Sequence, residues 1–192
     1  MTLTQYNTAT SIDGFIADES NSLDWLFQVE AEGTEDRFAG FLADIGAIAM
    51  GSTTYNWVLD HERVLDEPAK WKSWYGDRPS WVFTHRELPP IPGADIRFVQ
   101  GDVRPVHAKM VEAAGDCNIW LVGGGELVGQ FADCGLLDEI ILGIAPVTLG
   151  AGAPVLPRRL TGALRLAGVK AVNNAFVEVR YRLQRDEQQS SA

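Results

Sequence analysis

Short apolar runs bounded by turn residues alternate along this chain with segments whose apolar residues repeat at helical spacing. The short runs predict buried strands, and the helical repeats predict amphipathic helices between them. Strands are expected at residues 3–10, 15–17, 45–50, 81–84, 95–100, 119–122, 137–143 and 144–149. Helices are expected at residues 22–26, 34–44, 105–114 and directly after residues 51 and 125. In the helix at 105–114, we expect Val106, Met110 and Val111 to face inward.

The order of these elements indicates the fold class. Strands and helices alternate over the first part of the chain, which favours a mostly parallel sheet with helices on both faces. Residues 164–172 and 175–183 then have the pattern of a hairpin across Asn173-Asn174, which adds antiparallel strands at one edge. The 192 residues show neither an internal repeat nor a linker. We therefore expect a single α/β domain over residues 1–184 and a polar, disordered tail at 185–192.

The segment 118–133 carries the most informative local pattern. An apolar run at 119–122 leads directly into glycines at 123–125, and Glu126 and Leu127 then begin a helical pattern. A strand that passes through glycines into a helix presents bare N–H groups at the positive end of a helix dipole, where an anion such as phosphate can bind. The spacing is neither G-x-G-x-x-G nor a Walker loop. A tight turn that needs glycine explains the same pattern, so both explanations stay open.

Charge and composition limit the possible partners. A formal net charge of −10 argues against nucleic acid, whose phosphates would be repelled. No apolar run is long enough to span a membrane, and the first residues lack the features of a signal peptide, so we expect a cytoplasmic protein. Cys117 and Cys134 are expected to be buried free thiols, and no Cys/His cluster has metal-binding spacing. The tryptophans between residues 57 and 81 favour packing over a stacking platform.

Ligands of α/β sheets bind at the carboxyl ends of strands, and three such ends here carry suitable groups. At residues 50–55 a glycine and several hydroxyl groups precede a helix, and at residues 122–126 three glycines precede a helix. Residues 82–86 add a hydroxyl and a cation. Four segments, in this order along the chain, match the pattern of a known family: SIDGFIA at 11–17, AMGSTTY at 49–55, WLVGGGEL at 120–127 and PVTLGAG at 146–152. Together they resemble the RibD C-terminal domain family of riboflavin-biosynthesis reductases, in the dihydrofolate-reductase-like superfamily. The resemblance covers roughly residues 3–183 and implies a three-layer dihydrofolate-reductase-like fold.

The resemblance implies NADPH as the cofactor, and residues of this chain suit it. Backbone and hydroxyl groups at 51–54 would meet the diphosphate at a helix N-terminus. The loop after the expected strand at 81–84 would read the adenosine 2′-phosphate, where Arg86 offers a forked donor; a solvated surface charge is the alternative. The expected cofactor-binding residues are Ala9, Ile16, Gly51, Ser52, Thr53, Thr54, Thr84, His85, Arg86, Gly123, Gly124, Gly125, Glu126 and Leu127.

Asp13 is the catalytic candidate, because the resemblance places this aspartate near the nicotinamide and the substrate. A carboxylate there can donate or relay a proton as hydride arrives at a C=O or C=N carbon. The alternative is a turn aspartate that bonds the backbone beside Gly14. Trp25 and Asp36, the latter with its neighbour Glu35, are the substrate-binding candidates. Packing explains Trp25 equally well, and an acid in a first helical turn also suits the helix dipole.

These expectations lead to an NADPH-dependent oxidoreductase resembling 5-amino-6-(5-phosphoribosylamino)uracil reductase, acting on a small C=O or C=N substrate. The family's Asp-Asn/Asp-Pro-x-Leu-Thr-x-Arg stretch, which helps bind a ribose phosphate, is replaced by NWVLDHER at residues 56–63. A dihydrofolate or pterin reductase is the alternative enzyme. A non-catalytic nucleotide-binding protein that kept the fold is the rival from another class. The resemblance also implies a homodimer.

Overall fold

The computed structural model describes residues 1–29, 34–172 and 175–184, without the side chains of residues 34–36. The expected tail at 185–192 and the expected turn at Asn173-Asn174 thus lie outside the described residues. The strands are β1 (Thr4–Thr10), β2 (Phe15–Ala17), β3 (Ile45–Gly51), β4 (Ser80–Phe83), β5 (Ile96–Val99), β6 (Asn118–Gly123), β7 (Glu139–Ile144), β8 (Ala153–Pro154), β9 (Arg165–Val172) and β10 (Phe176–Arg182). The helices are α1 (Asp24–Phe27), α2 (Thr34–Ala43), α3 (Ser52–Glu62), α4 (Ala69–Tyr75), α5 (Val103–Ala114) and α6 (Gly125–Asp133).

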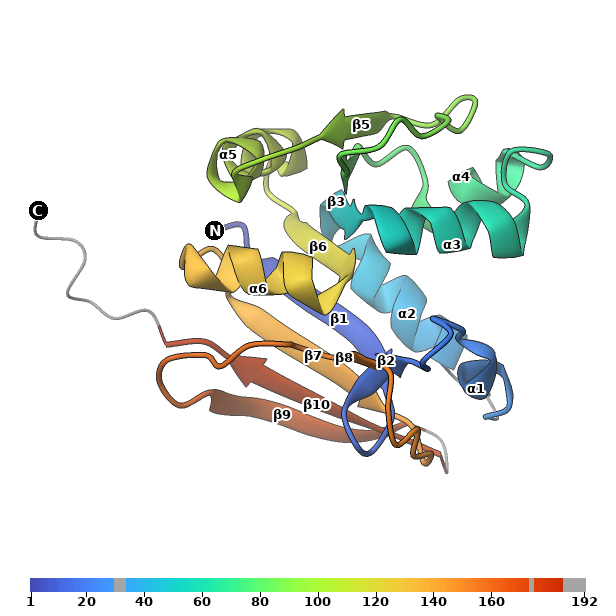
Figure 1. The fold of residues 1–192 in the computed structure, drawn as a ribbon. Coiled ribbons are helices and arrows are strands. Elements are labelled where there is room, and N and C mark those ends of the chain that lie inside the picture. Colours follow the sequence, from blue (N-terminus) through green and yellow to red (C-terminus); the bar gives the residue numbers. More distant parts are fainter. Residues whose placement is uncertain (30–33, 173–174, 185–192) are drawn as a thin grey trace, which may run out of the picture.

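An eight-stranded sheet organises the described part of the chain, in the order β5-β4-β3-β6-β1-β7-β10-β9 (Figure 1). Neighbouring strands from β5 to β7 are parallel, because helices or long crossovers connect them. β10 runs antiparallel to both β7 and β9. The predicted fold class is therefore confirmed: a mostly parallel α/β sheet ends in an antiparallel strand pair.

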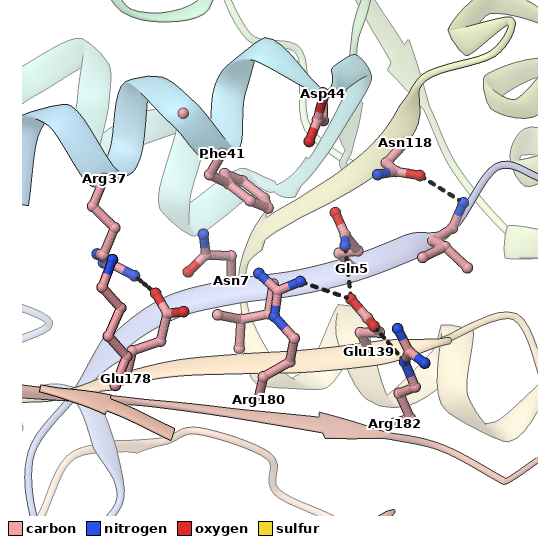
Figure 2. Close-up of a pocket in the computed structure, with 14 residues that line it drawn as sticks. Gln5, Asn7, Arg37, Phe41, Asp44, Asn118, Glu139, Glu178, Arg180 and Arg182 are labelled. Carbon is pink, nitrogen blue, oxygen red and sulfur yellow. Dashed lines mark hydrogen bonds and ion pairs between the residues drawn. The ribbon is translucent and has the colours of Figure 1, made fainter. Parts of the chain in front are cut away.

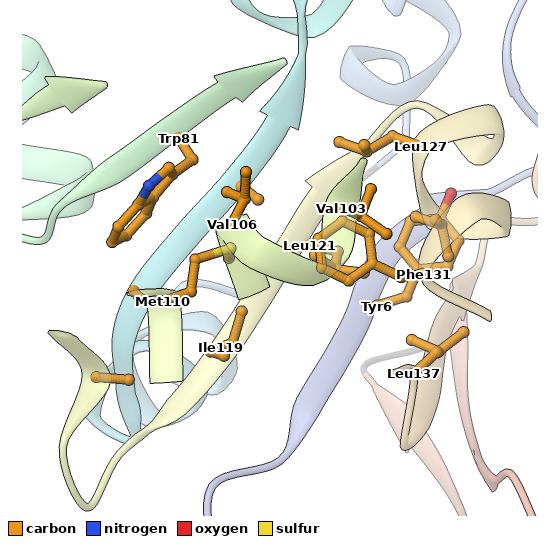
Figure 3. Packing of buried hydrophobic residues seen from close by; sticks show 14 of the residues in the cluster. Tyr6, Trp81, Val103, Val106, Met110, Ile119, Leu121, Leu127, Phe131 and Leu137 are labelled. Atoms are coloured by element: carbon orange, nitrogen blue, oxygen red, sulfur yellow. The ribbon is translucent and has the colours of Figure 1, made fainter. Parts of the chain in front are cut away.

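Helices cover both faces of the sheet, and each face has its own apolar core. On one face α5 and α6 pack onto the central strands through Met110, Phe131 and Leu121 (Figure 3). On the other face α3 and α4 pack through residues such as Trp71, and Phe41 of α2 lies against the same cluster. Because each fully buried side chain of this size contributes roughly 1.5–3 kcal/mol, these two cores hold the three layers together.

The tryptophans between residues 57 and 81 serve packing, as the sequence indicated. Trp71 and Trp81 are each only 1% exposed. Trp57 and Trp74 are partly buried and lie against the core under α3 and α4. The aromatic side chains of this region are thus largely taken up by the fold.

The segment 144–149 does not form a strand, so that prediction was wrong. β7 ends at Ile144, and the chain then turns toward the connection between β1 and β2. There the Ile12 N–H donates to the Val147 carbonyl at 2.8 Å. Pro146 has no N–H for a ladder, which favours leaving the sheet at this point. The Ala145 N–H still donates to the Thr10 carbonyl at the end of β1, and beyond it the segment bonds to a turn near the start of the chain.

Two smaller predictions also differ from the structure. Val111 is 36% exposed, whereas it was expected to face inward with Met110. Cys117 and Cys134 are free thiols as expected, but both are only half-buried. Within the described residues, no helix is long and apolar enough to cross a membrane, and no group of acidic, His or Cys side chains is placed to hold a metal ion.

Candidate functional site

The carboxyl ends of three neighbouring strands meet at one edge of the sheet. β3 lies between β4 and β6 and runs parallel to both, with Gly51 opposite Phe83 and Met50 opposite Gly123. β3 continues directly into α3, and β6 is followed by α6. The register therefore brings together three segments that are far apart in sequence, at residues 50–55, 82–86 and 122–126.

These segments line a cavity of about 530 Å³, a size typical of small-molecule sites. The expected cofactor-binding residues on its wall are Gly51, Ser52, Thr53, Thr54, Thr84, His85, Arg86, Gly124, Glu126 and Leu127. The expected residues that do not line it are Ala9, Ile16, Gly123 and Gly125. Most of the predicted set thus converges on one cavity.

Two helices begin at the wall of this cavity with glycine at the cap position. α3 starts after Gly51 and α6 after Gly124, and neither N-terminus receives a side-chain hydrogen bond from its cap residue. The first N–H groups of a helix have no partner within the helix, so they are available to an anion. A Cβ at Gly51 would meet no atom within 4 Å, so space is open beside the α3 donors.

The glycines at 123–125 have structural reasons of their own. Gly124 has a φ of 77°, which side chains disfavour. A Cβ at Gly125 would lie 2.7 Å from the carbonyl oxygens of residues 154–155, and one at Gly123 would lie 3.2 Å from Thr54 Oγ1. A tight turn and close chain packing therefore account for these glycines, whether or not a ligand approaches them.

The loop after β4 supplies the cation of the cavity. Thr84 closes this loop, since its Oγ1 accepts the Arg86 N–H at 2.9 Å and its own N–H donates to the Val99 carbonyl at 2.9 Å. The side chains of His85 and Arg86 are exposed. Arg86 forms no ion pair with any residue that the structure describes. Its guanidinium is free to bind an anionic group.

One carboxylate, that of Glu126, stands on the cavity wall in the first turn of α6. Arg158 pairs with it and also with Asp133 at the far end of α6. Hydrogen bonds to Glu126 and Asp133 raise the pKa of Arg158 above its ordinary value. A Cβ at Gly129 would overlap the Arg158 side chain, so this glycine lets the arginine cross the helix. The acid beside the α6 N-terminus is thereby neutralised.

Asp13 lies in the turn between β1 and β2, where three groups donate hydrogen bonds to its carboxylate. These are Ser11 Oγ at 2.6 Å, the Gly150 N–H at 2.7 Å and the Leu149 N–H at 3.1 Å. The Ser11 hydroxyl, followed by the Gly150 N–H, lowers the pKa of Asp13 to about 2. The group is therefore an anion at neutral pH, and it ties this turn to residues 149–150.

The Asp13 turn and the cavity share a neighbouring segment. The Ile12 N–H donates to the Val147 carbonyl, and the Val155 N–H donates to the Gly14 carbonyl at 2.9 Å. The same segment reaches the start of α6, where residues 154–155 approach Gly125. Residues 147–155 thus connect the turn that carries Asp13 with one wall of the cavity.

The substrate-binding candidates and two cofactor candidates lie elsewhere. Trp25 is 7% exposed and belongs to a small core with Phe176, which is the packing role that the sequence left open. Ala9 packs against this same core, and Ile16 lies in β2. Asp36 and its neighbour Glu35 fall in the first turn of α2, but their side chains lie outside the described residues.

Sequence reasoning missed part of the cavity lining, notably Gln100 and Gln130. Gln100 follows β5, whose carboxyl end pairs with that of β4, so the parallel register could have placed it. Gln130 lies four residues after Glu126 on α6, which puts the two on one helix face. Phe83 and Gly101 complete the lining.

Comparison with known sequences gives a consistent result. The family model described as RibD C-terminal domain matches residues 3–177. The uncharacterized protein YwjB of Bacillus subtilis is 33% identical over 175 residues, which cover 90% of this chain and 93% of that protein.

Solved structures share the architecture. A putative riboflavin biosynthesis protein from Shewanella sp. PV-4 superposes with a TM-score of 0.76 at 24% identity, over 96% of this chain and 100% of that one. Dihydrofolate reductase from Enterococcus faecalis, solved with NADP(H), superposes with a TM-score of 0.56 at 14% identity, over 96% of this chain and 97% of that one. At these identities the likeness shows the fold alone, and that fold is dihydrofolate-reductase-like.

Proposed function

This chain belongs to the RibD C-terminal domain family, and from that membership we propose that it is an NADPH-dependent oxidoreductase. The family and the fold support a reductase that resembles RibD. When bound, NADPH would supply the hydride, and a small C=O or C=N compound would accept it.

The observation that carries the proposal is the cavity at the carboxyl ends of β3, β4 and β6. Two helix N-termini with glycine caps offer backbone donors there, as a diphosphate requires. Arg86 adds an unpaired guanidinium, as a 2′-phosphate requires. The one carboxylate on the wall, Glu126, is already paired with Arg158. The residues present therefore fit an anionic dinucleotide.

The roles of single residues follow from this fit. Gly51 and the hydroxyls of residues 52–54 would hold the diphosphate at the start of α3. Thr84 would keep its loop closed, so that His85 and Arg86 meet the adenosine phosphate. The start of α6 would cover the cofactor from the other side.

We propose Asp13 as the catalytic residue, and its low pKa limits which proton-transfer step it can perform. With a pKa of about 2 the carboxylate is ionised, so it can accept a proton or stabilise positive charge. Donating a proton would require the bound substrate to raise this pKa. Trp25 and Asp36 remain proposed substrate contacts, and the burial of Trp25 in a core with Phe176 favours an indirect role for it.

The substrate proposal is reduction of an open-chain ribose carbonyl or imine on an aminopyrimidine, the reaction that the family resemblance implies. Residues 56–63, which replace the family's ribose-phosphate stretch, fall mostly within α3. This favours a related substrate without that phosphate, such as a pterin or another small carbonyl or imine. A non-catalytic nucleotide-binding protein is the second candidate, because the cofactor cavity would serve it equally.

A turnover assay separates these candidates. The purified protein is given NADPH with an aminopyrimidine riboside, a pterin or a simple carbonyl compound, and NADPH oxidation is followed. We expect oxidation with at least one class. Asp13→Asn should lower turnover by about a hundredfold or more and leave NADPH affinity unchanged. NADPH binding without oxidation in every case would favour the non-catalytic protein, and full turnover by the variant would remove Asp13 from the mechanism.

We also propose that residues 1–184 act as a single domain, that the protein is cytoplasmic and that it forms a homodimer. The support for the homodimer is the outermost strand, β9, which is exposed along nearly its whole length. Leu166, Val169 and Val177 on this strand pair are 56%, 61% and 41% exposed. Edge strands of this kind are usually covered by another element or another chain.

A further inference from the structure

A second cavity, of about 450 Å³, lies on the sheet face beside α2 (Figure 2). Its wall includes Gln5 near the start of β1 and Glu139 at the start of β7, at the amino ends of these parallel strands. The cofactor cavity lies at the carboxyl ends of β3, β4 and β6. The two cavities are therefore separate sites.

The strand register explains which side chains meet in this second cavity. Asn7 lies opposite Ile141, which lies opposite Arg180, so these three form a row across β1, β7 and β10. The neighbouring row contains Gln5, Glu139 and Arg182. α2 contributes positions 37, 40 and 41, the spacing of one helix face, and Asp44 follows directly after the helix.

Several charges in the cavity are already paired. Glu139 is 1% exposed and accepts hydrogen bonds from Gln5 Nε2 at 2.8 Å and Arg182 Nε at 2.8 Å. Arg37 of α2 pairs with Glu178 of β10. These contacts fix the side chains of Glu139, Arg37 and Glu178 in the cavity wall, because each of these charges has a partner.

Other polar groups in the cavity have no hydrogen-bond or ion-pair partner among the described residues, or only a weak one. Asn7 is 6% exposed, and its side-chain amide makes no hydrogen bond to any described residue. Arg180 has one loose contact, with 3.7 Å between its Nη1 and Glu139 Oε2. Lys170 is exposed and forms no ion pair within the described part of the chain, whereas Arg37 Nε is buried without a partner there. The unpaired groups are chiefly donors, with the Asn7 amide able also to accept.

The Asn7 amide and Arg37 Nε are buried without a partner among the described residues, which lowers stability, so their presence needs a reason. The side chains of Arg180, which is 38% exposed, and of Lys170, which is exposed, are open to a ligand. The lining holds four cationic side chains against three carboxylates, in a chain whose net charge is −10. We propose that this cavity binds a small organic anion. Its carboxylate or phosphate group would lie on Arg180 and Lys170, and the rest of it would hydrogen-bond to Asn7 beside the Phe41 ring. The proposal does not depend on the proposed reductase activity.

Three substitutions test the cavity in different ways. Arg180→Gln removes the proposed anion contact. Asn7→Leu replaces the unpaired amide with an apolar group of similar size and should raise Tm by about 2–4 °C. Gly40→Leu fills space, because a Cβ at Gly40 meets no atom within 4 Å, and leucine favours a helix more than glycine does. Gly40→Ala is the matched control, since it adds only a methyl group.

The binding experiment is calorimetric titration with inorganic phosphate and, separately, malonate, each against sodium chloride of equal ionic strength. The protein carries Arg86→Gln, which removes the exposed cation of the cofactor cavity from the measurement. We expect binding of at least one anion, weakened tenfold or more by Arg180→Gln, Asn7→Leu and Gly40→Leu but not by Gly40→Ala. The two anions distinguish a phosphate from a carboxylate ligand.

Some results would overturn the proposal. No heat beyond the sodium chloride control with either anion would do so, as would binding that all three variants leave unchanged. A fall in Tm for Asn7→Leu would mean that the amide serves the fold itself. If Arg180→Gln changed the sedimentation coefficient and left anion binding unchanged, the cavity would belong to a contact between two copies of the chain.

Discussion

The Asp13 carboxylate is held by donors that come from two distant parts of the sequence. Ser11 is two residues away, whereas Leu149 and Gly150 lie more than a hundred residues further along the chain. Because these groups bond the ionised form, the pKa of Asp13 falls from its ordinary value of 3.8 to about 2. The negative charge of Asp13 therefore helps to hold the turn at residues 11–14 against residues 149–150.

This shift predicts a pH dependence of stability. A group whose pKa is lowered by folding stabilises the folded state above its ordinary pKa, and loses that effect as the pH falls through the folded pKa. The Asp13 contribution should be complete above about pH 4 and should disappear as the pH falls toward about 2. Unfolding measured across this window should have a shallower pH slope in Asp13→Asn. Ser11→Ala, which removes the first donor, should have an intermediate slope, and equal slopes in all three proteins would contradict the account.

At the residue scale, the sequence predicted the groups that follow a strand end directly. Gly51, Thr54 and Arg86 could be placed because parallel neighbours bring their carboxyl ends to one edge. The partners of Asp13 at 149–150 could not be placed, since their contact depends on a loop that crosses to a distant turn. Burial of Trp25 in a core with Phe176 likewise depends on tertiary packing that no local pattern reveals.

The two strand-to-helix junctions differ in why they contain glycine, and this can be tested. Gly51→Thr places a side chain in open space, with a backbone already extended at φ −82° and ψ 164°. A threonine there can cap α3 and occupy its donors, so Tm should hold or rise while NADPH affinity falls tenfold or more. Gly125→Ala should cost roughly 1–3 kcal/mol of stability, because its Cβ meets two carbonyl oxygens. Equal losses of stability in both variants would contradict this distinction.

Along α6, Arg158 should matter for the cofactor through Glu126. Arg158→Gln leaves a carboxylate unpaired beside the proposed diphosphate site, so NADPH affinity should fall, most strongly at low salt. Adding Glu126→Gln should restore much of that affinity, because the repulsion is then gone. Titrations of the single and double variants form a double-mutant cycle. If the second substitution gave no recovery, Arg158 would act only by holding α6 in place.

At the element scale, the sequence predicted most strands and helices within a residue or two, because their periodicity is strong. The segment 144–149 was wrongly expected as a strand, since its apolar residues fit one but its hydrogen bonds beyond Ala145 go to a turn. The sequence also missed α4 and β8, because elements of 7 and 2 residues carry little periodicity. Val111 shows a second limit: its apolar character does not guarantee a place under the sheet, and it is 36% exposed at the edge of the α5 face.

At the scale of the whole molecule, exposed apolar side chains of the described strands gather on β9 and β10, at one end of the sheet (Figure 1). If a second copy covers this surface, Val169→Lys should weaken the dimer, since a charge there would be buried without a partner. Analytical ultracentrifugation of the unaltered protein should show two chains per particle, and the variant should shift toward one. Lys109→Ala, on α5 on the other side of the sheet, is the control. A clean single-chain species for the unaltered protein would remove the homodimer from the proposal.

The central claim concerns the cofactor, and the most direct measurement is a titration with NADPH and NADH followed by tryptophan fluorescence. We predict that NADPH binds at least tenfold more tightly than NADH, a difference of about 1.4 kcal/mol. Arg86→Gln should remove most of this preference while NADH affinity stays nearly the same. If neither nucleotide bound, the family and the fold would stand, but the reductase function proposed for this cavity would be contradicted.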